Sequence, residues 1–155
     1  MAADAYFDAL TLLARRELSE AQIRQRLARR GHPPAAIDTA VERLKAEGAI
    51  DDVRVAGAIA RTQTHVRGRG KLRVVRQIEA TGIASSIAKR VVDEVFQDVD
   101  SDALLAAALE KRLRGRATID EHDARRLYRY LTAQGFDSDR VLAALRRRKA
   151  SRPVG

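Results

Sequence analysis

The chain has 155 residues, of which 30 are Lys or Arg and 21 are Asp or Glu, so its formal net charge at pH 7 is +9. An excess of this size indicates a polyanionic partner, and the length allows one domain or a short array of modules. The absence of cysteine excludes disulfides, while the acidic start and the lack of a long apolar run favour a soluble, cytoplasmic protein.

Three prolines, nine glycines, many helix-forming residues and no alternating strand pattern predict an all-α protein. The first helix is expected from Asp4 to about Glu17. Ser19 then has the position of an N-cap, and Gln22 completes a capping box for a second helix that stops at Gly31. Further helices are expected from Pro33 to Gly48, from Asp51 or Asp52, across 68–83, from about Ser85, from Asp102 to about Leu113, from Asp120 or Asp123 to Gln134, and from Ser138 to about Lys149.

Three helix-stopping glycines recur at intervals of roughly fifty residues, which indicates an internal repeat. They are Gly31, Gly82 and Gly135, and an apolar residue lies four and eight positions before each of them: Leu27, Ile78 and Leu131, then Ile23, Val74 and Leu127. Small units of this kind pack against their neighbours. The pattern predicts three tandem three-helix repeats in an elongated, curved array, at 1–49, 50–99 and 100–150, followed by a flexible tail at 151–155.

The middle repeat has the longest stretch of single-sign charge. No acidic residue occurs from Val53 to Ile78, but seven basic residues do: Arg54, Arg61, Arg67, Arg69, Lys71, Arg73 and Arg76. On a helix, Arg69, Arg73 and Arg76 lie opposite the apolar side, which predicts an anion-binding face, the alternative being a solvated face that only confers solubility. Lys71 points toward the apolar side and either snorkels or binds.

A second basic cluster ends the last helix at Arg146, Arg147, Arg148 and Lys149. These cations either complement the helix dipole or bind a partner. The net charge rises from +1 for 1–50 to +3 for 51–99 and +5 for 100–155. A graded excess suits a protein with a localised basic region.

Enzyme chemistry is not indicated. The adjacent Asp51 and Asp52 have the position of a helix cap and its neighbour rather than a catalytic pair. His32, His65 and His122 lack metal-ligand spacing, and no nucleotide-binding loop or nucleophile motif occurs, so no catalytic residue, metal or cofactor is expected. Aromatics are few, and Tyr130 is expected to be the most exposed. DNA contacts should therefore be mainly to phosphates, with little sequence preference.

From Tyr6 to about Arg148, the chain resembles the RecX family of bacterial recombination regulators. The matching elements are Tyr6 with Ala9-Leu10, Leu13 to Arg16, Leu18-Ser19-Glu20, Leu27 to Gly31, Leu44, Gly48 to Asp52, the helix from Gly70 to Ile83, Gln134-Gly135-Phe136, Val141 and Leu145. Each is weak alone, whereas their order and spacing are specific.

The resemblance implies tandem three-helix repeats that bind the RecA recombinase filament on single-stranded DNA. It implies a regulator, mainly negative, of RecA ATP hydrolysis, strand exchange and filament extension, with single-stranded DNA and then double-stranded DNA as further partners and a monomer favoured. An independent DNA-binding protein, of helix-turn-helix type or without sequence preference, is the alternative, and an inert helical scaffold is a third. The candidate RecA- or DNA-binding residues are Arg61, Arg67, Arg69, Lys71, Arg73, Arg76, Arg146, Arg147 and Lys149.

Overall fold

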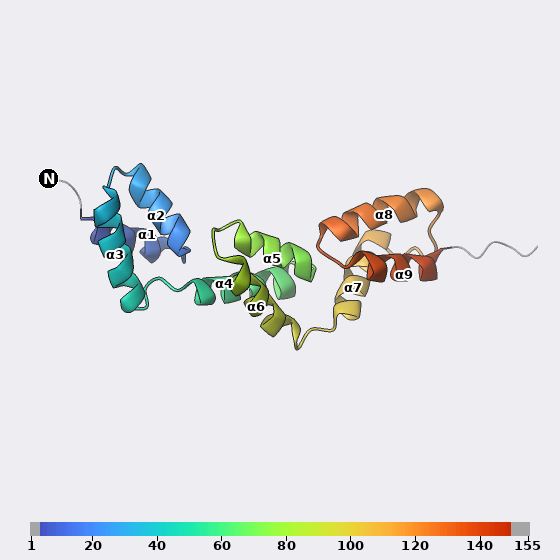
Figure 1. The fold of residues 1–155 in the computed structure, drawn as a ribbon. Coiled ribbons are helices and arrows are strands. Elements are labelled where there is room, and N and C mark those ends of the chain that lie inside the picture. Colours follow the sequence, from blue (N-terminus) through green and yellow to red (C-terminus); the bar gives the residue numbers. More distant parts are fainter. Residues whose placement is uncertain (1–3, 150–155) are drawn as a thin grey trace, which may run out of the picture.

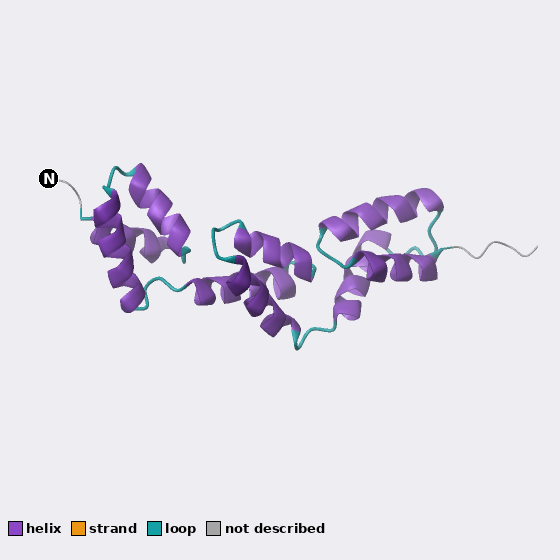
Figure 2. Cartoon of the chain, in the orientation of Figure 1, coloured by secondary structure: helices purple, strands orange, loops and turns teal. Residues whose placement is uncertain are grey.

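The computed structural model describes residues 4–149, in which the chain forms nine α-helices and one π-helix (Figures 1 and 2). The all-α prediction is confirmed, and the expected tail at 151–155 lies outside the described residues. The helices are α1 Ala5–Arg15, α2 Glu20–Arg29, α3 Pro34–Ala46, α4 Asp52–Arg61, the π-helix η1 Thr62–Val66, α5 Lys71–Glu79, α6 Ser85–Phe96, α7 Ser101–Leu113, α8 Glu121–Ala133 and α9 Ser138–Arg148.

The helices form three groups that follow one another in an elongated, curved array, as the sequence predicts (Figure 1). Repeat 1 comprises α1–α3, repeat 2 comprises α4, η1, α5 and α6, and repeat 3 comprises α7–α9. Each has its own hydrophobic core, built around Leu27, Val41 and Leu44 in repeat 1, Val74, Ile78 and Val92 in repeat 2, and Leu131, Val141 and Leu145 in repeat 3. The residue boundaries between the repeats stay a prediction.

The glycine register is the same in all three repeats. Gly31, Gly82 and Gly135 follow the second helix of their repeats with φ of 91°, 84° and 98°, in the left-handed region where a side chain is strained. The apolar residues four positions earlier are fully buried. The repeat inferred from spacing is therefore present in the packing.

Side-chain caps fix where several helices begin. Ser19 forms the predicted capping box, because its hydroxyl accepts from the Gln22 backbone N–H while the Gln22 side chain accepts from the Ser19 N–H. Asp51, rather than Asp52, caps α4 and accepts from the Arg54 backbone N–H. These contacts satisfy amides that a helix start leaves unpaired.

The same kind of junction joins repeat 1 to repeat 2 and repeat 2 to repeat 3. The start of the second helix of one repeat lies on the glycine turn of the next. At the first junction, the Ser19 hydroxyl donates to the Thr81 carbonyl at 2.5 Å, and a Cβ added to Gly82 would lie 2.4 Å from Ala21 Cβ. At the second, Gly70 N–H donates to the Gln134 carbonyl at 2.8 Å and Leu72 N–H donates to the Gly135 carbonyl at 3.2 Å.

The middle of repeat 2 differs from the expectation in two ways. The basic helix α5 begins at Lys71 after the N-cap Gly70, so Arg69 precedes the helix and does not share a helical face with Arg73 and Arg76. The chain also continues from α4 into the π-helix η1, which the sequence did not predict, and Arg69 N–H then donates to the Gln63 carbonyl. The backbone just before α5 bonds to repeat 3 instead of extending the helix, because Gly70 N–H donates to the Gln134 carbonyl.

Candidate nucleic-acid interface

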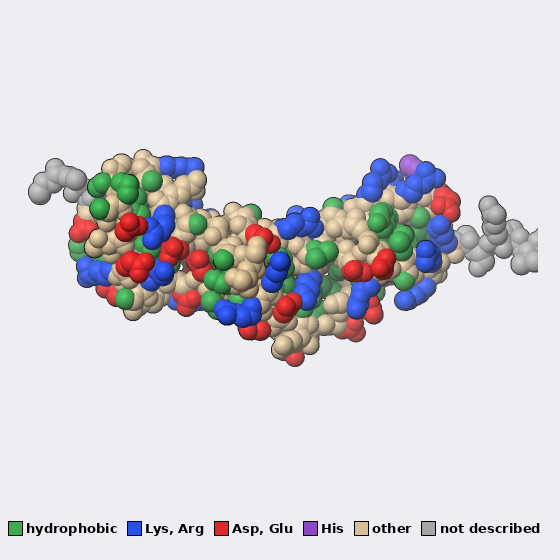
Figure 3. All heavy atoms as spheres, viewed as in Figure 1, with side chains coloured by type: hydrophobic (Ala, Val, Ile, Leu, Met, Phe, Trp, Pro, Cys, Tyr) green, Lys and Arg blue, Asp and Glu red, His purple; other side chains and the backbone are tan. Residues whose placement is uncertain are grey.

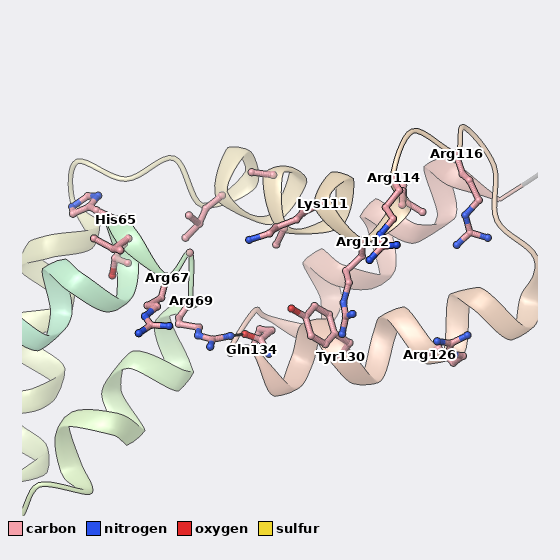
Figure 4. Close-up of a pocket in the computed structure, with 17 residues that line it drawn as sticks. His65, Arg67, Arg69, Lys111, Arg112, Arg114, Arg116, Arg126, Tyr130 and Gln134 are labelled. Carbon is pink, nitrogen blue, oxygen red and sulfur yellow. Dashed lines mark hydrogen bonds between the residues drawn. The ribbon is translucent and has the colours of Figure 1, made fainter.

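A wide cleft lies between repeats 2 and 3 and has a volume of about 1320 Å³ (Figure 4). We call it the basic cleft. Its lining includes seven Lys or Arg residues and no Asp or Glu. The basic lining residues are Arg67, Arg69, Lys111, Arg112, Arg114, Arg116 and Arg126, with His65 on the repeat 2 side.

The π-helix η1 and the turn after it form the repeat 2 wall. His65 and Arg67 are exposed there, whereas Thr64 is 1% exposed and its hydroxyl has no hydrogen-bond partner within residues 4–149. Arg69 donates to the Gln134 side chain and ties this wall to repeat 3. π-helical turns often occur at functional sites, and the buried, unpaired hydroxyl of Thr64 lies in this one.

The end of α7, the turn after it and one side of α8 form the repeat 3 wall. Arg112 lies over the Tyr130 ring with its guanidinium carbon 3.6 Å from the ring centroid. Arg116 pairs with Asp123 at 3.0 Å. No acidic side chain of the described chain pairs with Lys111 or Arg126, so both retain their charge for a ligand.

Arg114 reaches the cleft from a strained backbone position. It ends α7 with φ 50° and ψ 45°, which is left-handed, and Gly115 follows with φ 86°. A non-glycine residue in this region costs of order 1–2 kcal/mol. The turn places Arg114 between Arg112 and Arg116 at the rim (Figure 4).

Asp120 sets where α8 begins and thereby where its side chains enter the cleft. The backbone N–H of Asp123 donates to Asp120 Oδ1 at 2.8 Å, and this hydrogen bond lowers the pKa of the Asp120 carboxyl. A carboxylate at this end also complements the helix dipole. The resulting register directs Arg126, Tyr130 and Gln134 to the same side of α8.

The structure separates the predicted basic residues of repeat 2. Arg67 and Arg69 line the basic cleft, while Arg61 and Arg76 are exposed outside its lining and Arg73 is half-buried where its backbone meets Gly135. Lys71 pairs with Asp93 of α6 at 2.6 Å. The expectation of a single arginine face on one helix is therefore wrong, because Arg69 lies outside that helix.

The predicted residues at the end of α9 lie away from the basic cleft. Arg146 and Lys149 border a second groove between α8 and α9, and Lys149 pairs with Glu121 at 2.8 Å. Arg147 is exposed on α9. Arg148, which was part of the same run, pairs with Glu110 of α7.

The sequence analysis missed the repeat 3 wall of the cleft. Its signal was present as a dense basic run from Lys111 to Arg116, in which Arg114-Gly115-Arg116 echoes Arg67-Gly68-Arg69. The two runs lie far apart in sequence, and only the second junction brings them to one cleft. Figure 3 shows Lys and Arg side chains gathered along α8, whereas repeat 1 mixes both signs of charge.

The aromatic residues also need a correction. Phe7, rather than Tyr130, is the most exposed large aromatic of the described chain, with 64% of its surface accessible. Tyr130 is half-buried because Arg112 covers one face of its ring. This pair still lies beside the other basic groups of the cleft.

The described residues contain neither a membrane span nor a metal-binding cluster. None of the helices within residues 4–149 is both long enough and apolar enough to span a bilayer. Over the same residues, His, Asp and Glu side chains do not gather in a group of three that could hold a metal ion.

Three repeats of three α-helices, with a basic cleft between the last two, define an all-helical tandem-repeat protein. A sequence profile described as "RecX, first three-helix domain" matches residues 5–44. The regulatory protein RecX of Halorhodospira halophila is 36% identical over 138 residues, which cover 88% of this chain and 83% of that protein. The chain therefore belongs to the RecX family of regulatory proteins.

Other relatives agree with this membership. The regulatory protein RecX of Chromohalobacter salexigens is 32% identical over 138 residues, covering 89% of this chain and 88% of that protein. A crystal structure of RecX from Lactobacillus salivarius superposes with a TM-score of 0.77 at 16% identity, covering 92% of this chain and 94% of that one. A second crystal structure, of a regulatory protein RecX, gives 0.74 at 22% identity and covers 92% and 70%. These two structures share the fold.

Proposed function

We propose that this chain is a negative regulator of the RecA recombinase, and that it binds the RecA filament on single-stranded DNA. It reduces ATP hydrolysis, strand exchange and filament extension without a catalytic step of its own. The observation that carries the proposal is the acid-free basic cleft in a chain of the RecX family. A recombinase filament with its DNA is a polyanion of the kind that such a cleft attracts.

Phosphate contacts supply most of the DNA affinity in this proposal. Arginine offers a planar fork of donors to phosphate oxygens, and every neutralised phosphate releases condensed counterions. The cleft residues come from η1, the α7–α8 turn and α8, so a strand that follows the cleft contacts two repeats at once. Backbone contacts of this kind fix position and carry little sequence information.

The first experiment measures RecA ATP hydrolysis on single-stranded DNA with sub-stoichiometric protein, at two salt concentrations. The cleft variant carries Lys111→Ala, Arg114→Ala and Arg126→Ala. The matched control carries Arg15→Ala, Arg16→Ala and Arg29→Ala, which remove the same charge from exposed positions of repeat 1. We expect the cleft variant to lose suppression and the control to keep it. Equal suppression by both variants would remove the cleft from the mechanism.

DNA binding alone is measured with the same proteins and a labelled single-stranded oligonucleotide, without RecA. The slope of log affinity against log salt is negative, and loss of three phosphate contacts should make it shallower by about 2, at roughly 0.7 per contact. If the oligonucleotide binds as expected but RecA activity does not change, the alternative of an independent DNA-binding protein replaces the proposal. A defined footprint on duplex DNA would favour the helix-turn-helix form of that alternative.

A further inference from the structure

A second groove lies on repeat 3, between α8 and α9, and has a volume of about 590 Å³. We call it the α8–α9 groove. Its apolar lining comes from Ala124, Tyr128, Leu142 and Leu145. The side of α8 that lines this groove is not the side that lines the basic cleft, to which Arg126 and Tyr130 belong. One helix therefore separates two surfaces of different chemistry.

The corresponding positions of repeat 1 form an ion pair. Seven residues before and after the stop glycine, repeat 1 has Arg24 and Asp38, whose Nη1 and Oδ1 lie 2.6 Å apart. Repeat 3 has Tyr128 and Leu142 at these two positions. An ion-paired surface of one repeat is thus replaced by an apolar opening in another.

Basic residues predominate at the edge of the α8–α9 groove, where Glu121, an acidic lining residue, pairs with Lys149. Arg125, Arg129 and Arg146 line it and are exposed, and none of them pairs with an acidic side chain in the described part of the chain. Leu142 is 37% exposed. In Figure 3, hydrophobic side chains lie over the α8–α9 region with basic side chains around them.

We infer that the α8–α9 groove docks an acidic peptide segment of a partner protein, with one large apolar side chain of the peptide inserted between Tyr128 and Leu142. The apolar floor takes the anchor, and the three arginines take carboxylates that flank it. A nucleic-acid backbone is bound mainly by cations and hydrogen-bond donors; the basic cleft has seven Lys or Arg residues, whereas the floor of this groove is apolar. The inference is independent of which enzyme the protein regulates.

The probe is a short fluorescein-labelled peptide in which glutamates flank a single phenylalanine. A polyglutamate peptide with the same number of glutamates is the control for electrostatics, and a single-stranded oligonucleotide reports on the basic cleft. We expect the phenylalanine peptide to bind the full chain at low salt, measured by fluorescence anisotropy. The polyglutamate peptide should bind about tenfold more weakly, because it buries no apolar side chain.

The decisive variant is Leu142→Asp, which gives repeat 3 the residue that repeat 1 has at this position. It should weaken the phenylalanine peptide by about tenfold or more, while the oligonucleotide affinity falls by less than twofold. The matched control, Arg126→Ala on the cleft side of α8, should weaken the oligonucleotide and leave the peptide unchanged. Circular dichroism checks that both variants keep their helicity, and Leu142→Ala replaces the first variant if it does not fold.

Three results would overturn the inference. One is no binding of the phenylalanine peptide at low salt. Another is equal binding of the phenylalanine and polyglutamate peptides, which would mean attraction by charge alone. The third is an equal loss of oligonucleotide and peptide affinity in the Leu142 variant, which would assign the groove to nucleic acid. None of these results bears on suppression of RecA by the basic cleft.

Discussion

Arg114 combines backbone strain with a position on the basic cleft. Its φ of 50° is the single positive value for a non-glycine residue among residues 4–149. Strain of this kind persists where the surrounding structure fixes it, and it concentrates at functional sites. The strained turn keeps a third arginine beside Arg112 and Arg116.

We predict that Arg114→Gly makes the protein more stable and a weaker binder. Glycine adopts the left-handed region without cost, so the free energy of unfolding should rise by about 0.5–1 kcal/mol, measured by calorimetry. The oligonucleotide affinity should fall through loss of the charge. Arg114→Ala is the matched variant that loses the charge but keeps the strain, and a stability gain of the same size in that variant would refute the explanation.

Single residues were predictable where one local rule decides them. The capping box at Ser19 depends only on its neighbours in sequence, as do the buried positions four residues before each stop glycine. Arg69 was placed wrongly because its environment depends on Gln134, a residue of another repeat. Pattern within one helix carries no information about that contact.

At the scale of elements, Gly135 is constrained both by its positive φ and by its contact across the second junction, whereas Gly31 is constrained by its φ alone. A Cβ at Gly135 would lie 2.3 Å from the backbone nitrogen of Arg73, whereas a Cβ at Gly31 would have no atom within 4 Å. Both have a φ above 90°, so the backbone strain of an alanine is similar at the two positions. The difference between the stability losses of the two alanine variants therefore measures the cost of separating repeat 2 from repeat 3.

We therefore expect Gly135→Ala to be the more damaging of the two variants. Gly31→Ala should lower the free energy of unfolding by about 1–2 kcal/mol from strain alone. Gly135→Ala should lose about 1–3 kcal/mol more from overpacking at the junction. Calorimetry of both variants checks this, and equal losses would show that the junction gives way without cost.

The contact between α2 and α3 predicts an acid-sensitive repeat 1. The Lys45 ammonium lies 2.9 Å from Glu20, and its hydrogen bond lowers the pKa of that half-buried carboxyl. Because the folded-state pKa lies below the unfolded value, the stabilisation is full above about pH 4.3 and is lost as the pH falls through the lower folded value. Thermal melts of Glu20→Gln should show a weaker dependence below about pH 4.3 than wild type. The control Glu42→Gln leaves the 2.9 Å contact in place and should melt like wild type.

Most helix ends were predictable to within a residue or two, but the bounds of α5 and the π-helix η1 were not. Capping and stop signals are local: they placed Gly31 and Gly82 correctly and limited the cap of α4 to Asp51 or Asp52, of which Asp51 is the cap. The continuation of α4 into Thr62–Val66 lacks such a signal. The buried Thr64 in that segment is polar, so an apolar pattern could not reveal it.

On the scale of the whole molecule, the three cores are separate, which predicts stepwise unfolding. Leu131 is fully buried in repeat 3, and Leu131→Ala should cost about 2–5 kcal/mol there. In a linear array this loss falls mainly on the altered repeat and its neighbour. Hydrogen exchange should therefore accelerate in α7–α9 while α1–α3 keep their protection. Uniform acceleration along the chain would instead indicate one cooperative unit.

The architecture was predictable from the sequence, and the cleft only in part. Evenly spaced glycines with matching apolar offsets are enough to predict tandem repeats, because each unit obeys the same local rules. The cleft depends on how repeat 3 is set against repeat 2, which the backbone contacts of Gly70 and Leu72 determine. The sequence therefore indicated Arg67 and Arg69 but not Lys111 or Arg126.

The second junction also joins the two walls of the basic cleft. Its bonds from Gly70, Leu72 and Arg69 to Gln134 and Gly135 set how far apart the two walls stand. In the function proposed above, a strand bound by both walls restrains the rotation of repeat 3 on repeat 2, and a junction already held in the bound geometry binds that strand more tightly because less ordering is needed. Rigidity at this joint is thus a property on which selection can act to tune affinity without altering any cation of the cleft.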